Sequence, residues 1–505
     1  MANWASKYYL KKAGFAVCLF LLGIITTTLA TDNVWKFDPS LQRAYQLVLN
    51  LETDRAEAEL KRLEANPAHA LHRLYVESFN ETLDVLISED EEKFNLIEER
   101  FEERFKYLDG LKPSAETLFL RAELNLQRGF NFLNLGQEIN AVLAIRTAYN
   151  HAQECIKKYP QFIPILKTNG VIQVMIGSVP DKYHWFMSLL GMKGSVMTGQ
   201  KQLQSLRDSE SSLHTEATIL YYTIKGLINQ QHEEAAAGIL SCLDEQPSNR
   251  LVLFLGVNML MKNSQSEKAL ELIQTLDREK DGLPMHYIDY LRGEIYLQRG
   301  NYDLAVKTYH NFINNYKSIN FKKDANFKIA MAYQLMGKDD MARRYFEIAK
   351  KTGKDIAEPD RYAAAQLREE SPPNAKLFMV RMATDGGYYP EAKDLFRSIS
   401  PADLKSEKDR TEYYYRKARL ADKTGDLKAA KLYYEQTIDM VGDRPWYFAA
   451  NAALQLGYLA HARKDYLQAK VYFEKALSYK KHEYKNSIDG KAKSALEQLK
   501  TEGAS

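Results

Sequence analysis

A pattern of small and aromatic residues occurs twice between Tyr287 and Ala349 and constrains the fold of this chain strongly. One copy contains Gly293, Tyr296, Gly300, Tyr302, Ala305 and Tyr309, and the next contains Ala330, Tyr333, Gly337, Ala342, Phe346 and Ala349. Small side chains on both partners let two antiparallel helices approach closely, and aromatic rings fill the space around that contact. Gly300 and Gly337 provide the left-handed turn that ends the first helix of each pair.

One such pair cannot bury its apolar face alone, so the pattern predicts an all-α stack of pairs, a right-handed helical-repeat solenoid. Further small residues mark the packing position on the second helix of each predicted pair: Ala236, Ala269, Ala305, Ala342, Ala392, Ala430 and Ala469. The gap from Ala342 to Ala392 is 50 residues, and it contains Pro359, Pro372 and Pro373. We interpret residues 358–374 as an inserted helix and joint.

The other boundaries follow from where the repeats are regular. We predict regular repeats over 210–357 and 375–490, a capping helix and frayed tail over 491–505, and a helical region of degenerate repeats over 31–209. The least repeat-like stretch is GVIQVMIGSVPDKYHWFMSLLGMKGSVMTGQKQ, residues 170–202. We interpret it as a connector that plugs the N-terminal core, so Trp185→Ala should destabilise the fold by about 3–5 kcal/mol. The alternative is that Tyr183–Leu190 contacts a partner or a lipid. In that case Trp185→Ala should melt normally and lose binding to that partner or lipid.

The first thirty residues have the form of a signal peptide. Lys7, Lys11 and Lys12 precede an apolar run, residues 13–25, and small residues follow, ending at Ala30. The run is shorter than the roughly 18 residues expected of a membrane span. We therefore expect export to the periplasm or cell envelope, with removal of residues 1–30. The alternative is an uncleaved signal anchor over 13–25, which would make this a membrane-associated protein.

Charge and cysteine content exclude some partners. Without residues 1–30 the chain has 66 basic and 66 acidic residues, so a nucleic acid is not expected as a partner. Cys155 and Cys242 lie in separate helical patterns, and we expect two unpaired thiols that act as small apolar residues.

Motifs for catalysis and for cofactor binding are missing from the sequence. It has no G-x-x-x-x-G-K-[ST], G-x-G-x-x-G, G-x-S-x-G or H-E-x-x-H. His69 and His72 are three residues apart, with no third ligand nearby to complete a metal site. We therefore expect no cofactor, no metal and no catalytic site, and an enzyme or accessory subunit with an unrecognised site is the alternative.

A stack of helix pairs offers a concave groove lined by first helices, where a protein or peptide partner can bind. The predicted register places these residues in the groove: Tyr287, Tyr290, Glu294, Gln298, Phe327, Met331, Gln334, Glu412, Tyr415, Arg419, Asp422, Lys423, Asn451, Tyr458 and His461. Apolar residues stand where a carboxylate clamp would need lysine: Tyr290, Phe327, Tyr415 and Leu454. Capture of an acidic chaperone tail is therefore not expected.

The repeats over about 210–480 resemble the tetratricopeptide (TPR) family. Residues 123–159 together with the 170–202 stretch also resemble the tetratricopeptide-repeat protein 39 and inclusion-body clearance family, in which a proline leads an apolar helix into a glycine-rich step. Members of that family are largely intracellular, and the leader of this chain departs from them. These resemblances imply a non-enzymatic scaffold or adaptor for protein–protein interaction.

Overall fold

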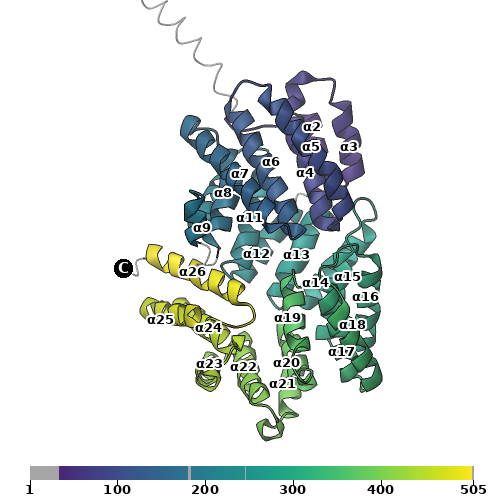
Figure 1. The fold of residues 1–505 in the computed structure, drawn as a ribbon, viewed down its shortest axis with the longest axis vertical. Coiled ribbons are helices and arrows are strands. Elements are labelled where there is room, and N and C mark those ends of the chain that lie inside the picture. Colours follow the sequence, from purple (N-terminus) through teal and green to yellow (C-terminus); the bar gives the residue numbers. More distant parts are fainter. Residues whose placement is uncertain (1–32, 180–183, 245, 503–505) are drawn as a thin grey trace, which may run out of the picture.

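The computed structural model describes residues 33–179, 184–244 and 246–502. Within these ranges all regular structure is helical, and most helices form antiparallel pairs that stack into a solenoid (Figure 1). The prediction of an all-α repeat solenoid is therefore confirmed. The predicted leader, residues 1–30, lies outside the described residues. In the described part of the chain, no helix combines the length and the apolar character needed to cross a membrane.

The N-terminal half is built from long pairs. They are α2 (Pro39–Leu49) with α3 (Thr53–Arg62), α4 (Ala70–Ser88) with α5 (Glu91–Asp109), α6 (Ala115–Asn134) with α7 (Glu138–Lys158), and α8 (Ile165–Gly177) with α10 (Val196–Arg207). The short helix α9 (His184–Leu189) lies in the connection between α8 and α10.

Glycines in the 170–202 stretch allow α8 and α10 to cross at close range. A Cβ atom on Gly199 would lie 2.4 Å from the carbonyl oxygen of Gly170, and one on Gly177 would lie 2.7 Å from the backbone nitrogen of Val196. Larger residues would force the two backbones apart. The glycine-rich step therefore has a packing role in the N-terminal core.

The apolar patch of the same stretch divides between core and surface. Met187 and Leu190 pack against the main core, whereas Leu189 is 72% exposed. Tyr183 and the side chains of Trp185 and Phe186 lie outside the described residues. The Trp185→Ala prediction therefore stays a prediction.

The later repeats are shorter and more regular. They are α11 (His214–Leu227) with α12 (His232–Leu240), α13 (Arg250–Lys262) with α14 (Ser266–Arg278), α15 (Tyr287–Gln298) with α16 (Tyr302–Asn315), α17 (Lys322–Leu335) with α18 (Asp339–Lys351), α20 (Ala375–Gly386) with α21 (Tyr389–Arg397), α22 (Glu407–Lys423) with α23 (Leu427–Val441), and α24 (Tyr447–Ala462) with α25 (Tyr466–Ser478). Helix α19 (Glu358–Leu367) has no such partner and occupies the gap of 50 residues noted in the sequence.

The predicted packing of small residues against rings is present. All seven alanines of the ladder are buried, each on the second helix of its pair. A Cβ atom on Gly293 would lie 2.9 Å from the ring of Tyr309, and one on Gly457 would lie 2.4 Å from the ring of Phe473. Gly300 ends its helix with a φ of +84°, as the left-handed turn requires.

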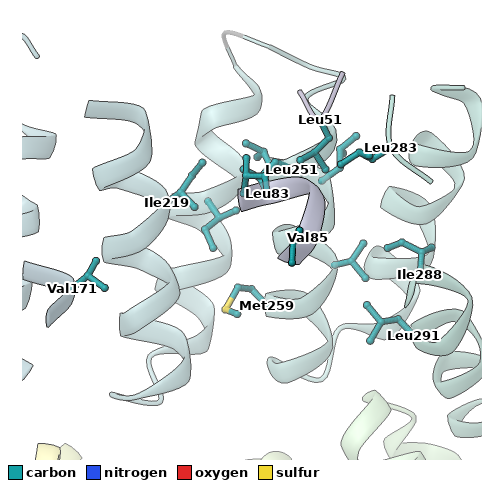
Figure 2. Close-up of a cluster of buried hydrophobic side chains, with 14 of the residues drawn as sticks. Leu51, Leu83, Val85, Val171, Ile219, Leu251, Met259, Leu283, Ile288 and Leu291 are labelled. Carbon is teal, nitrogen blue, oxygen red and sulfur yellow. The ribbon is translucent and has the colours of Figure 1, made fainter. Parts of the chain in front are cut away.

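The main apolar core runs without a break through the N-terminal half and the middle repeats. Figure 2 shows part of it, in which Leu251 and Met259 of α13 and Ile288 and Leu291 of α15 lie in the same cluster as Leu51 from the turn after α2. A second core joins α22 to the C-terminus.

Successive turns of the superhelix contact each other. The backbone nitrogen of Arg250 donates to Oδ1 of Asn50 at 2.8 Å, and that of Leu283 donates to the Leu51 carbonyl at 2.8 Å. Segments about 200 residues apart in the sequence therefore lie side by side.

The last helix, α26 (Lys485–Thr501), folds back onto the N-terminal half. Ser494 Oγ donates to Asn229 Oδ1 at 3.0 Å, and Ser195 bonds with Glu497. Figure 1 shows α26, in yellow, between α24 and the teal helices. The predicted capping helix over 491–505 corresponds to α26, which buries Ile488, Ala492 and Leu499 because it packs on α24, α25 and α10.

Candidate functional site

The inner faces of the later repeats enclose a cavity of about 550 Å³, which we call the central cavity. Its walls come from the first helices α13, α15, α17, α20 and α22, together with α19, α26 and the start of α12. Seven predicted groove residues line it: Tyr287, Tyr290, Glu294, Gln298, Phe327, Arg419 and Lys423. The register of the first helices thus brings together residues from three repeats.

The other predicted groove residues are placed differently. Met331 is fully buried, because α17 lies in the core between α18, α19 and α20. The prediction that it faces the groove was wrong. Glu412 pairs with Arg416 on its own helix at 2.6 Å, and Tyr415 is 3% exposed beside Tyr447.

Residues of α24 that were predicted to face the groove contact neighbouring helices. The ring of Tyr458 lies 5.3 Å from that of Phe473. His461 forms an ion pair with Glu502 at 2.7 Å. Phe473 belongs to α25, the partner helix of α24, and Glu502 directly follows α26, which also packs against α24.

One wall of the cavity carries a buried lysine held by two acids. Lys328 lies 2.7 Å from Asp324 and also pairs with Glu294, and Tyr290 donates to Asp324 at 2.6 Å. Burial lowers the pKa of Lys328, but the two carboxylates raise it more, so the ammonium stays charged. With one ammonium and two carboxylates, this wall carries a net charge of −1.

A second group of cavity residues is cationic. We define the cationic cluster as Lys262 at the end of α13, Arg419 and Lys423 on α22, and Lys491 on α26. Burial, and then the positive charges of Lys262 and Arg419, lower the pKa of Lys491 to about 8 against the opposing effect of Glu358. Burial and the proximity of Arg419 lower the pKa of Lys423 as well.

His232 reports the combined field of the cluster. Its pKa is lowered to about 3, by burial first and then by Lys423, Lys491, Lys262 and Arg419. The imidazole is therefore neutral at physiological pH, and its buried Nδ1 has no hydrogen-bond partner among the described residues.

Six cationic side chains and four carboxylates line the cavity, giving it a net charge of +2. The cations are Lys262, Lys328, Arg381, Arg419, Lys423 and Lys491, and the acids are Glu294, Asp324, Glu358 and Asp385. The guanidinium of Arg381 lies 4.5 Å from the Tyr362 ring centre and 3.6 Å from Asp385. The positive excess therefore lies at the cationic cluster.

A larger groove, of about 710 Å³, runs between α3, α4 and α5, and most of its cations are paired with acids of the same groove. Arg104 lies 2.6 Å from Glu81, and Lys93 lies 2.6 Å from Asp84. It contains none of the predicted groove residues, and we do not assign it a role.

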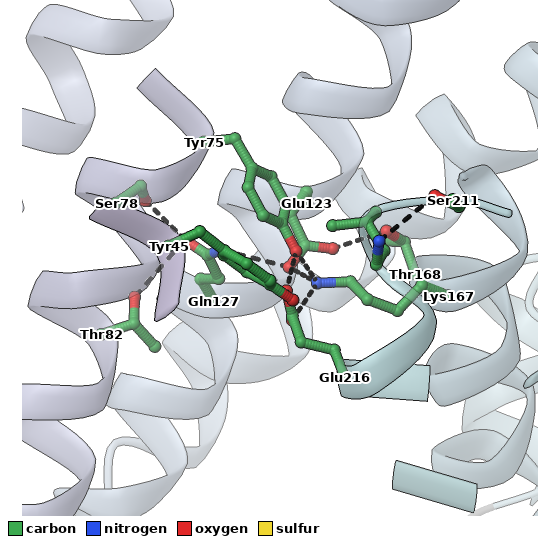
Figure 3. A network of polar contacts seen from close by, with 11 residues as sticks. Tyr45, Tyr75, Ser78, Thr82, Glu123, Gln127, Lys167, Thr168, Ser211 and Glu216 are labelled. Carbon is green, nitrogen blue, oxygen red and sulfur yellow. Dashed lines mark hydrogen bonds and ion pairs between the residues drawn. The ribbon is translucent and has the colours of Figure 1, made fainter. Parts of the chain in front are cut away.

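A second buried lysine, which the sequence did not reveal, lies in the N-terminal half (Figure 3). Lys167 Nζ is 2.7 Å from Glu123 and 2.9 Å from Glu216. Tyr45 and Tyr75 each donate to Glu216 at 2.7 Å. This network joins α2, α4, α6, α8 and α11, and it is a structural element of the core.

The structure also shows the surroundings of the two cysteines and the two histidines singled out in the sequence. Cys155 is buried, with a pKa raised to about 12 by burial, and Cys242 is half-buried; the two do not form a disulfide with each other. His69 pairs with Asp38 at 2.8 Å, and His72 packs on Trp35. Within the described ranges no group of three metal-ligating side chains converges.

Two family models, both described as tetratricopeptide repeat, match the chain. One matches residues 288–318 and 324–352, and the other matches 411–440 and 445–483. These stretches coincide with the pairs α15/α16, α17/α18, α22/α23 and α24/α25. The chain contains tetratricopeptide repeats. A TPR fold is typically a non-enzymatic scaffold that binds protein partners.

Solved structures of TPR proteins resemble the chain at low identity. The human IFIT1 dimer with PPP-AAAA is 14% identical, with 93% of this chain and 96% of that chain covered and a TM-score of 0.31. The P58(IPK) TPR domain is 15% identical, with 76% of this chain and 99% of that chain covered and a TM-score of 0.21. Yeast Tom70 is 12% identical, with 82% of this chain and 97% of that chain covered and a TM-score of 0.23. None of the curated proteins matches this sequence. These matches do not support the narrower resemblance to the protein 39 and inclusion-body clearance family.

Sequence reasoning missed Lys262, Arg381 and Lys491 as cavity residues. Lys262 and Lys423 each end a first helix, where a lysine is ordinarily explained by the helix dipole. Only the position of α22 and α26 opposite α13 brings these cations together.

Proposed function

We propose that this protein is a non-enzymatic scaffold that binds a protein partner in the central cavity. The observation that carries the proposal is the convergence of predicted groove residues from three repeats on one concave site. Its volume lies within the range of about 300–1,000 Å³ that is usual for ligand pockets. Aromatic and charged side chains, the types that anchor interfaces, alternate along its walls.

Site-specific photo-crosslinking tests this proposal. A photoreactive amino acid replaces Asn258, which lines the cavity from α13, or Lys307, which is exposed on α16. The cavity position should crosslink a discrete partner from native extract, and the Lys307 position should not. An excess of unlabelled protein should compete the crosslink away. Equal crosslinking at both positions would contradict partner binding in the cavity.

We propose further that the chain is exported to the cell envelope. The support is the order of Lys7, Lys11 and Lys12, the apolar run at 13–25 and the small residues ending at Ala30. Mass spectrometry of the protein purified from its native cells should find an N-terminus at Thr31. An intact Met1 in a membrane fraction would instead support the anchored alternative.

A further inference from the structure

The cationic cluster is poorly compensated by the protein itself. Among the described residues, Lys262, Lys423 and Lys491 form no ion pair or hydrogen bond. Two acids, Asp385 and Asp422, act on Arg419 and Lys423. Neither pairs closely with them: Asp422 lies 3.9 Å from Arg419 and already accepts from Tyr434 at 2.8 Å, and Asp385 lies 3.6 Å from Arg381. The cluster therefore has unused donors that face a shared space.

Holding these cations together works against the fold. Like charges in a partly buried site repel one another, and neutralising them would relieve that repulsion. The four side chains come from three helices that are far apart in the sequence, so local helix preferences do not explain the clustering. An anion from outside the chain would offset the repulsion and use the free donors.

The net charge of the cavity indicates how much negative charge an anion would need to neutralise it. A net charge of +2 matches a phosphate group, which carries about −1.5 to −2 at neutral pH. Lysines act as point charges on flexible stems, which suits a tetrahedral phosphate approached from several sides. We propose that the cationic cluster binds a phosphate group, either free or carried by the protein partner.

This inference rests on the proposed function only for the carrier of the phosphate. Binding of inorganic phosphate tests the cluster by itself, without any partner. If phosphate does not bind but the Asn258 position crosslinks a partner, the scaffold proposal stands and the phosphate proposal fails. If phosphate binds but no partner is crosslinked, the phosphate site stands and the scaffold proposal fails.

Isothermal titration calorimetry of the full chain with inorganic phosphate, at pH 7 and low salt, is the direct experiment. Lys262→Gln, Lys423→Gln and Lys491→Gln should each weaken binding by about tenfold to a hundredfold, as expected for the loss of one hydrogen bond to a charged group. Lys307→Gln, an exposed lysine on α16, is the matched control and should bind like the wild type. Absence of saturable binding, or an equal loss in Lys307→Gln, would refute the proposal.

Thermal melting separates loss of the site from loss of the fold. Without phosphate the three cluster variants should melt at the wild-type temperature or above it, because each removes a repelling charge. Phosphate should raise the melting temperature of the wild type and of Lys307→Gln. It should not raise that of a variant that combines Lys262→Gln, Lys423→Gln and Lys491→Gln. Tighter binding of succinate or citrate than of phosphate would overturn the choice of phosphate.

Proton uptake gives a readout that is specific to Lys491. The groups facing it are Lys262 on α13, Glu358 on α19, Arg419 on α22 and the neutral His232 on α12. With a pKa of about 8, about half of the Lys491 side chains are neutral at pH 8. A bound anion favours the charged ammonium, so these side chains should take up a proton from the buffer when the anion binds. Calorimetry at pH 8 in buffers of different ionisation enthalpy should show this uptake. Lys491→Arg should keep phosphate affinity and show less uptake, and unchanged uptake would count against the assignment of Lys491.

Competition identifies the source of the phosphate. If the partner carries it, inorganic phosphate at saturating concentration should abolish the Asn258 crosslink, and phosphatase treatment of the extract should do the same. If the ligand is free phosphate, both treatments should leave the crosslink intact.

Discussion

Replacement of Lys167 by methionine tests what the buried network of Figure 3 contributes. Methionine keeps most of the volume of the lysine stem and removes the charge. The Lys167 side chain is 4% exposed, and those of Glu123 and Glu216 are 4% and 5% exposed. The variant would therefore leave two buried carboxylates without their shared cation.

The expected loss in the free energy of unfolding is about 3–5 kcal/mol, the usual cost of removing one partner of a buried ion pair. The hydroxyls of Tyr45, Tyr75 and Thr168 still donate to the two carboxylates. These donors soften the penalty and place the expected value at the lower end of the range. A second substitution, Glu123→Gln, removes one of the stranded charges and should recover part of the loss.

Urea unfolding followed by circular dichroism at pH 7 measures the effect. The matched control is Lys158→Met, which breaks an exposed pair with Glu154 on one helix and should leave the free energy of unfolding nearly unchanged. A loss for Lys167→Met no larger than that of the control would refute an electrostatic role for the network.

Three further predictions concern packing and a helix cap. Ala305→Leu and Ala342→Leu overpack buried contacts between paired helices, and each should lower stability by about 1–3 kcal/mol; unchanged thermal melting of both would mean that the contacts are looser than the structure indicates. Gly457→Ala should lower the melting temperature although alanine favours helix, because its Cβ atom would lie 2.4 Å from the Phe473 ring; a rise would show that the ring can move aside. Asp360 accepts two backbone N–H groups at the start of α17, and burial raises its pKa to about 7. Since this is above the value of about 3.9 expected in the unfolded chain, the free energy of unfolding should fall as pH rises from about 4 to about 7. Asp360→Asn removes the titratable group and keeps one of the two accepting oxygens, so it should flatten that slope in urea unfolding at pH 5 and pH 8. An unchanged slope would place its origin elsewhere.

The cap of α17 shows why local signals were incomplete. Its N-terminal residue, Phe321, has a φ of +63° and provides no side-chain acceptor. The acceptor comes from Asp360 on α19, 39 residues later in the chain. A local capping motif could not have revealed it, because the partner is brought in by tertiary packing.

The sequence by itself determined the repeat architecture of this protein. The spacing of Ala305 and Ala342, the rings around them and the turn glycines act within one helix pair, so they are readable from neighbouring residues. Tyr287, Tyr290 and Glu294, which the same register assigned to the groove, line the central cavity from α15.

Only the tertiary structure decided what that inner face encloses. The superhelix returns segments about 200 residues apart to contact, and α26 packs on α24, where Glu502 pairs with His461. The same closure brings Lys262, Lys423 and Lys491 together, although each alone is an ordinary helical lysine. Small rotations between successive repeats accumulate over the whole stack, so the curvature that sets these contacts is a property of the assembled chain.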